Sequence, residues 1–305
     1  MTNSSVAAGT LADYGAITTT KALSRALDTT GLFDKTYVDG NLSPIDQFIK
    51  NTNAVNLVWL SRPDISPELA SIVLLGYMSA VESYMRALLR SIINVDDTAK
   101  LVVEAQQISF AAAMHHDKAI LPEALLEEIS FAGPDNIKKS LNRFLGLQPA
   151  FNDMEIYFNE FEKISQLRHC CTHRFGKLGT KNAVVLGLSK HNGCLEKPLK
   201  LGRTELELAA DILRDFVKTL NNLIFRAILD RTATGGKTTV KDLDSVKAGW
   251  TWTYRRDRKK FAEYYSVFAS TTDAVPSPDA KEVYESFASA FKPKPKAPSK
   301  PGKSK

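Results

Sequence analysis

Apolar residues recur every three or four positions along one long segment in the first third of the chain. Between residues 67 and 93 the most regular of them are Leu74, Met78, Val81, Met85, Leu88 and Ile92. This spacing places their side chains on one face of an α-helix. Pro67 suits the first turn, because the N–H that proline lacks would have no partner there. The pattern predicts a core helix over residues 67–93.

Three segments that follow have the same helical period. Residues 96–114 and 133–147 are predicted as shorter helices, with Asp or Thr as N-caps and Gly146 as a stop signal. Residues 153–176 repeat the apolar spacing and carry it into the sequence RHCCTH. We therefore expect RHCCTH to occupy the last turns of a helix.

A different pattern precedes the last long helix. In residues 182–201 two short β-like runs flank an Asn-Gly dipeptide, which favours the type I′ turn of a hairpin. Residues 204–229 then return to the helical period, with Thr204 and Glu207 in the spacing of a capping box. The predicted fold is all-α, a helical bundle with one small β-hairpin inserted before its last long helix.

Breaks in these patterns, such as TATGGKTT at residues 232–239, divide the chain into four predicted parts. They are an N-terminal extension (1–55), the helical bundle (56–232), an aromatic and basic helical extension (233–290) and a Lys/Pro-rich tail (291–305). The tail holds six lysines and no acid, which accounts for the net charge of +6. Because this composition cannot bury apolar surface, we expect a disordered tail. It would either attract polyanions weakly or only solubilise the protein.

Composition places the chain among ordinary globular proteins. It has 305 residues, 44% of them hydrophobic and 24% charged, which is enough material for a sizeable core. Its three cysteines, two of them adjacent, argue against a disulfide framework and favour a reducing compartment. The N-terminus lacks a secretory pattern, and no uninterrupted apolar run approaches about 20 residues. We expect a cytoplasmic protein that does not span a membrane.

The sequence RHCCTH is the strongest candidate for chemistry. On a helix, Arg168 falls on the apolar stripe, whereas His169 and His173 share a neighbouring face. A cation on a core stripe is costly unless it is paired or meets an anion. Histidines titrate near neutral pH and can move protons. An arginine for a phosphate and a histidine for a proton suffice to cleave RNA without a metal, since the 2′-hydroxyl can be the nucleophile.

These residues also have the form Arg, a polar residue, three more residues and His, which is the R-x4-6-H signature of the HEPN superfamily. The order of the segments adds to the likeness. An earlier long helix carries the lone acid Glu82 among apolar neighbours, and a short hairpin and a long closing helix follow the motif. Over residues 56–232 the chain resembles HEPN ribonuclease-like proteins of bacterial defence and toxin systems.

The resemblance implies a metal-independent endoribonuclease without a cofactor, acting in phage defence, as a toxin or in a stress response. Its composite site would form across a homodimer, and its other partners would be RNA and an antitoxin or regulatory protein. Arg168 would grip the scissile phosphate and His173 would be the general acid or base. Glu82 would orient Arg168 or a histidine. His169 stands where asparagine or aspartate is more usual, and would orient groups or carry a second proton.

Each of these residues also has a structural interpretation. Arg168 and Glu82 could form a purely structural pair, and His173 could favour the negative end of the helix dipole. Cysteines in the motif suit packing. A zinc site is a rival for six donors: His169, Cys170, Cys171, His173, His191 and Cys194. Neighbouring cysteines point about 100° apart on a helix, and an arginine beside them repels a dication, so zinc is disfavoured.

A second segment, residues 248–265, could contact RNA. Aromatic and basic residues alternate there, and the predicted RNA-binding residues are Trp250, Trp252, Arg255, Arg256 and Arg258. Bases stack on aromatic rings while cations meet phosphates. The alternative is a helix that docks its aromatic side chains on the bundle and exposes its charges.

Two classes of function remain open at this point. The first is an endoribonuclease that cleaves RNA by 2′-hydroxyl attack. The second is a catalytically silent HEPN module that binds a nucleotide, RNA or a partner protein. No serine-hydrolase elbow, Walker loop or Rossmann fingerprint is present. Both ends of the R-x4-6-H motif are intact, and this favours the enzyme.

Overall fold

The computed structural model describes residues 17–18, 25–38, 40–241 and 243–293. The chain consists of two compact units, Met1–Asn41 and Leu42–Lys305. In the first unit the described residues form turns, in which Asp28 and Asp34 each accept a hydrogen bond from the threonine two positions ahead. The boundaries predicted at residues 55, 232 and 290 stay predictions. Most of the predicted Lys/Pro-rich tail lies outside the described residues.

Helices build the second unit, as the sequence predicts. They are α1 (Pro44–Trp59), α2 (Pro67–Val95), α3 (Asp97–Val103), α4 (Phe110–His115), α5 (Leu121–Ala124), α6 (Pro134–Leu145), α7 (Glu155–Arg174), α8 (Thr180–His191), α9 (Arg203–Thr234), α10 (Tyr254–Phe268) and α11 (Ala280–Phe291), with 3-10 turns η1 (Asn152–Met154) and η2 (Asn192–Cys194). The described residues contain isolated β-bridges but no β-strand. The all-α prediction is confirmed.

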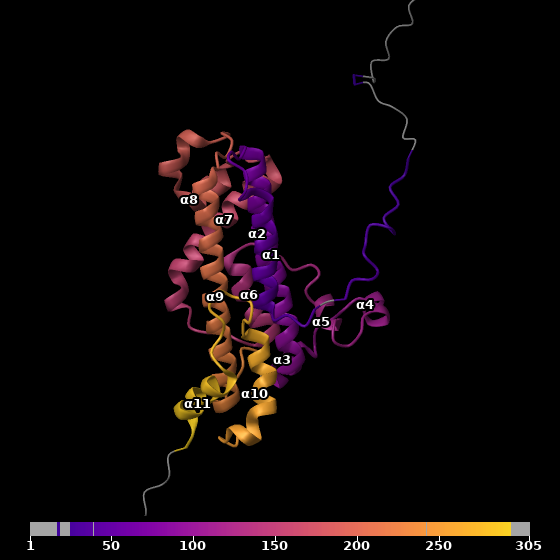
Figure 1. Cartoon of the computed structure of the whole chain (residues 1–305), viewed down its shortest axis with the longest axis vertical. Helices are drawn as coiled ribbons and strands as arrows, with labels where there is room; N and C mark the ends of the chain where they lie inside the picture. Colours follow the sequence, from indigo (N-terminus) through magenta and orange to yellow (C-terminus); the bar gives the residue numbers. More distant parts are fainter. Residues whose placement is uncertain (1–16, 19–24, 39, 242, 294–305) are drawn as a thin grey trace, which may run out of the picture. The chain divides into compact units, whose positions relative to one another are not determined.

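Helix α2 is the centre of the bundle. It packs against α1, α6, α7, α9 and α10, and Figure 1 shows α1, α2, α7 and α9 running side by side. All six residues of the predicted apolar stripe are buried. By length and composition α2 could also cross a membrane, with a mean hydropathy of 1.3 over its most apolar window. More than half of that window, 56%, is buried inside the bundle, as expected for a core helix.

The predicted β-hairpin is wrong, because residues 180–191 form helix α8. Gly179 is its extended N-cap residue, and the helix packs on α7, burying Ala183. Asn182 also donates to the side chain of Gln166 on α7 at 2.8 Å. Gly187, at φ 97°, kinks the helix, and the Asn-Gly dipeptide lies in the 3-10 turn η2. Contacts with α7 therefore outweigh the local preference for a hairpin turn.

Most helix ends follow the sequence signals, but the single helix predicted over residues 96–114 is two helices, α3 and α4, and the start of α9 is shifted. Asp96 caps α3 by accepting from the backbone N–H of Ala99, and Gly146 ends α6 in the left-handed region, both as predicted. At the start of α9, the Glu205 carboxylate accepts from the Gly202 N–H at 2.9 Å. The helix thus begins before the Thr204 cap that the sequence predicts.

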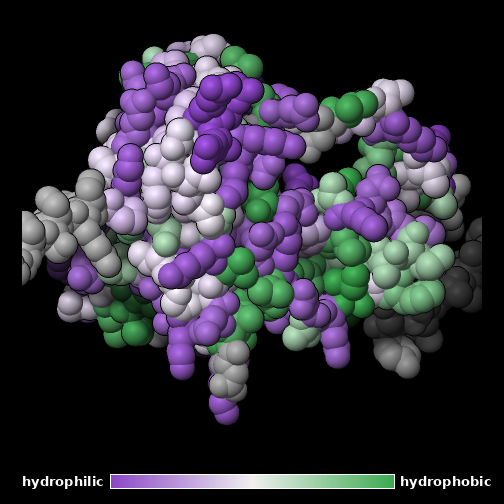
Figure 2. All heavy atoms as spheres, turned by 90° about the horizontal axis from the view of Figure 1, so that it is seen from below, coloured by the Kyte–Doolittle hydropathy of each residue, from purple (hydrophilic) through white to green (hydrophobic). Residues whose placement is uncertain are grey.

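The C-terminal helices lie at the end of the bundle away from α8 (Figure 1). Residues 248–253 lead into α10, and α10 and α11 pack together around a cluster of aromatic rings: Trp250, Phe261, Tyr264, Tyr284 and Phe287. Figure 2 looks at this end, where hydrophilic side chains cover much of the surface between smaller hydrophobic areas.

Candidate functional site

Arg168 and Glu82 meet across the seam between α7 and α2. The Arg168 Nη2 atom lies 3.5 Å from the Glu82 Oε1 atom, and the two side chains are 23% and 22% exposed. The other carboxylate oxygen of Glu82 accepts from the Phe131 N–H at 3.4 Å. Glu82 therefore holds the Arg168 guanidinium against α2. Because the Arg168 side chain is partly exposed, a ligand in solvent can still reach the guanidinium.

His169 and His173 lie one turn apart and form a stacked pair. Their ring centroids are 5.9 Å apart and the ring planes differ by 17°. His169 is half-buried and His173 is exposed. Burial lowers the pKa of His169, and the positive charges of Arg168 and His173 lower it further. The neutral imidazole of His169 is thus favoured beside a partner that is open to solvent.

The structure brings the four predicted catalytic residues to one region, in two pairs. Within one chain the ion pair of Arg168 is with Glu82, and the ring contact of His173 is with His169. The influence of Arg168 on the pKa of His169 links the pairs electrostatically. The motif helix ends directly after them, so His173 also lies at the negative end of the α7 dipole, as its structural interpretation requires.

Phe175 is a feature that the sequence analysis missed. It ends α7 in the left-handed region, at φ 50° and ψ 46°, and its side chain is 88% exposed. Beside it is a cavity of about 280 Å³ between the start of α2 and the end of α7. Cys171 lines this cavity and Ser71 hydrogen-bonds its thiol, while burial raises the thiol pKa. The packing role predicted for Cys171 fits that environment.

The rival zinc donors are spread over different environments. Cys170 is buried, Cys194 is exposed, and the ring of His191 contacts the Gly187 carbonyl oxygen at 2.9 Å. In the described part of the chain, no three His, Cys, Asp or Glu side chains gather in a group that could hold a metal ion.

No match to this chain is found among protein-family models, curated proteins or solved structures.

The predicted RNA-binding residues separate into a buried and an exposed set. Trp250 is only 8% exposed, and its indole N–H donates to the Thr232 hydroxyl at 3.0 Å. Trp252 is half-buried against Phe287, with ring centroids 5.6 Å apart. The exposed set is Arg255, Arg256 and Arg258, all on α10. Because the ring of Trp250 is buried, no base can stack on it. The accessible residues of the predicted set are therefore mainly the three arginines.

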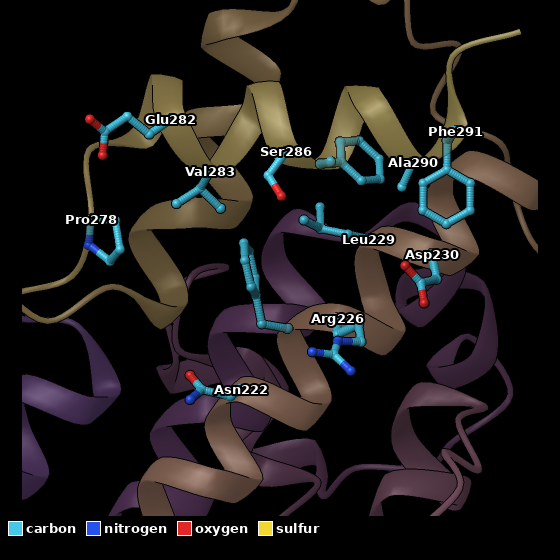
Figure 3. Close-up of a pocket in the computed structure, with 12 residues that line it drawn as sticks. Asn222, Arg226, Leu229, Asp230, Pro278, Glu282, Val283, Ser286, Ala290 and Phe291 are labelled. Atoms are coloured by element: carbon cyan, nitrogen blue, oxygen red, sulfur yellow. The ribbon is translucent and has the colours of Figure 1, made fainter. Parts of the chain in front are cut away.

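A larger groove of about 710 Å³ lies between α9 and α11. Figure 3 shows Val283, Ser286 and Phe291 projecting from α11 toward α9. Arg226 and Asp230 lie on the α9 side. Burial raises the pKa of Asp230 above its ordinary value, and the positive charge of Arg226 opposes this only in part. No residue of the R-x4-6-H motif lines this groove, so it is separate from the candidate catalytic site.

Proposed function

We propose that this chain is a metal-independent endoribonuclease of HEPN type, cytoplasmic and active as a homodimer. The observation that carries the proposal is the position of Arg168. It is a partly exposed guanidinium anchored by Glu82, next to a stacked histidine pair of which one member favours its neutral form. Together these groups supply a phosphate ligand and two proton carriers without a metal ion.

The reaction follows from the chemistry of these side chains. A neutral imidazole accepts the proton of the RNA 2′-hydroxyl, and the 2′-oxygen attacks the adjacent phosphorus. The P–O5′ bond breaks, and a protonated imidazole gives its proton to the departing 5′-oxygen. The products are a 2′,3′-cyclic phosphate and a 5′-hydroxyl. Arg168 stabilises the charge that develops on the phosphoryl oxygens.

The lowered pKa of His169 supports a specific division of labour. A group that is neutral near pH 7 serves as the base, so we assign the first proton transfer to His169. His173, which is exposed, then serves as the acid. In the composite site that the family resemblance implies, a histidine of one subunit completes the arginine of the other.

The exposed cations of α10 extend the proposal to RNA binding. Arg255, Arg256 and Arg258 lie on the surface, and in the described part of the chain none of them pairs with an acid. Such a row attracts a phosphate backbone without reading its sequence. The half-buried ring of Trp252 precedes them in the chain by three to six residues.

Cleavage of a mixed RNA pool in EDTA tests the proposal. The wild-type protein is expected to leave 2′,3′-cyclic phosphate ends, and His173→Ala is expected to slow cleavage at least a hundredfold. His115→Ala is the matched control, because His115 is also exposed but lies on α4, outside the motif. It should cleave like the wild type.

Two outcomes would decide against the enzyme. Equal cleavage by wild type and His173→Ala would assign the activity to another site or to a contaminant. No cleavage by either protein, together with RNA binding that depends on Arg168, would favour the second function, a catalytically silent HEPN module. Sedimentation gives an independent check, because a strict monomer would leave the composite site incomplete.

A further inference from the structure

Phe175, which ends α7, combines two unfavourable features, a left-handed backbone and an exposed ring. Its φ of 50° is in the left-handed region, where a residue with a Cβ atom is strained. Its ring is 88% exposed, so it gains little from burial. Backbone outliers of this kind concentrate at functional sites. The conformation of Phe175 therefore points to a ligand for the ring and for the cavity beside it.

The cavity is preformed and small. Its apolar wall comes from Ile72, Leu75 and Leu199, and its volume is about 280 Å³. Backbone hydrogen bonds hold the wall, among them one from the Leu199 N–H to the Gly176 carbonyl oxygen at 2.8 Å. Ligand sites usually have about 300–1,000 Å³. The cavity thus suits one planar ring better than a whole nucleotide.

The cavity and the Arg168–Glu82 pair share the α2–α7 seam. Cys171 lines the cavity and comes one helical turn after Arg168, a rise of about 4.5 Å along α7. On α2, Leu75 lines the cavity and precedes Glu82 by two turns. An RNA phosphate at Arg168 therefore has the cavity within reach of its own base or of the next one.

Two charged side chains at the cavity can distinguish one base from another. Glu68 and Lys177 both line it, and neither forms an ion pair in the described part of the chain. Hydrogen bonds from its own backbone N–H and from Ser66 lower the pKa of Glu68, so the carboxylate is ionised. A carboxylate accepts N–H groups and an ammonium donates to a carbonyl. Among the four RNA bases, guanine alone presents two adjacent N–H donors beside a carbonyl oxygen on its Watson–Crick edge.

We propose that this cavity holds a guanine base of the RNA substrate. Phe175 stacks on the base, Glu68 accepts from its N1–H and N2–H groups, and Lys177 donates to its O6 atom. This assignment rests on the proposed function, which supplies the RNA phosphate at Arg168. These three residues set the base preference, whereas Arg168 and the two histidines act on the phosphodiester.

Mapping of cut sites in a mixed RNA pool tests the assignment. Phe175→Ala and Phe110→Ala each remove an exposed phenylalanine ring, 88% and 81% exposed, but only Phe175 is next to the cavity. Wild type and Phe110→Ala are expected to show guanine enriched at one fixed position beside the cut. Phe175→Ala is expected to lose this enrichment and to cleave such sites about 5- to 150-fold more slowly, as the loss of one stacking contact predicts.

Calorimetric binding of nucleoside monophosphates to the whole protein separates the two proposals. Wild type and His173→Ala should bind guanosine monophosphate several-fold more tightly than the other three, and Glu68→Gln should remove that preference. Preferential binding without RNA cleavage would overturn the nuclease and keep the guanine cavity. Cleavage without guanine enrichment, with equal binding of all four nucleotides, would overturn the cavity assignment and keep the nuclease. The absence of both the binding preference and RNA cleavage would overturn both proposals.

Discussion

Arg231 on α9 donates a hydrogen bond of 2.6 Å to Asp96, the residue that caps α3. The two side chains are 7% and 1% exposed, and Arg231 also donates to the Leu145 carbonyl oxygen at the end of α6. One buried ion pair thus joins three helices that are distant in sequence. Burial lowers the pKa of Arg231, while the charge of Asp96 opposes this change.

Replacing Arg231 should destabilise the protein strongly. Arg231→Met leaves the Asp96 carboxylate buried without its cation, which typically costs about 3–5 kcal/mol of unfolding free energy. Arg214→Met is the matched control, because Arg214 forms a surface pair with Asp211 at 2.9 Å and is 44% exposed. It should cost less than about 1 kcal/mol. Urea denaturation measures both values, and equal costs would show that the buried pair has no special role.

Glu82 should matter more for activity than for stability. Glu82→Gln keeps an acceptor for the Phe131 N–H but removes the charge that anchors Arg168. We expect RNA cleavage to fall about tenfold, while the unfolding free energy changes by less than about 1 kcal/mol because the pair is partly exposed. Cleavage rates and urea denaturation test this. Unaltered cleavage would mean that Arg168 needs no anchor.

A control for this prediction is Glu123→Gln. Glu123 is 25% exposed and pairs with Arg86 and Arg90, so it is a similar partly exposed carboxylate outside the motif. It should not change cleavage.

His169 should make the folded protein sensitive to mild acid. Its folded pKa lies below the ordinary value of 6.5, so the unfolded chain takes up the proton first as the pH falls. The stability linked to His169 is therefore fully present above about pH 6.5 and is lost as the pH drops toward the folded pKa. His169→Gln should lose less stability than the wild type between pH 7 and pH 5.

Thermal unfolding across this pH range measures the difference, with His115→Gln as a control at an exposed position. A wild-type curve parallel to that of His169→Gln would contradict the pKa direction.

The cations on α10 should contribute to RNA affinity through charge alone. Arg255→Glu is expected to weaken binding of single-stranded RNA and to reduce the salt dependence of the affinity by about one counterion. Lys139→Glu makes the same change on the exposed side of α6 and serves as the control. Titrations at several salt concentrations compare them. Equal effects of the two variants would remove α10 as a specific RNA surface.

Much of the fold follows from local patterns. The apolar period predicts α2, α6, α7 and most of α9, and Gly146 marks the end of α6. These predictions succeed because a helix buries one face, and a buried face leaves its period in the sequence. Helix α1 spans the predicted boundary at residue 55, in a segment to which the apolar pattern assigns no helix, and nearly all of α11 falls in the extension that the sequence predicts only in general terms as helical.

Local preference fails where tertiary contacts decide. An Asn-Gly dipeptide favours a hairpin, but packing on α7 makes residues 180–191 helical. The alternation of aromatic and basic residues near Trp250 is compatible with docking or with exposure. Only the ring cluster of α10 and α11 determines that Trp250 is buried.

The sequence by itself determined the helical class, the core face of α2 and the placement of Arg168, His169 and His173 on one helix, since these depend on residues a few positions apart. Only the tertiary structure decided that Glu82, 86 residues away, meets Arg168, and that Phe175 is strained and exposed beside a cavity. A contact between distant residues depends on how helix faces pair. That pairing is a property of the whole packed core, and no local period encodes it.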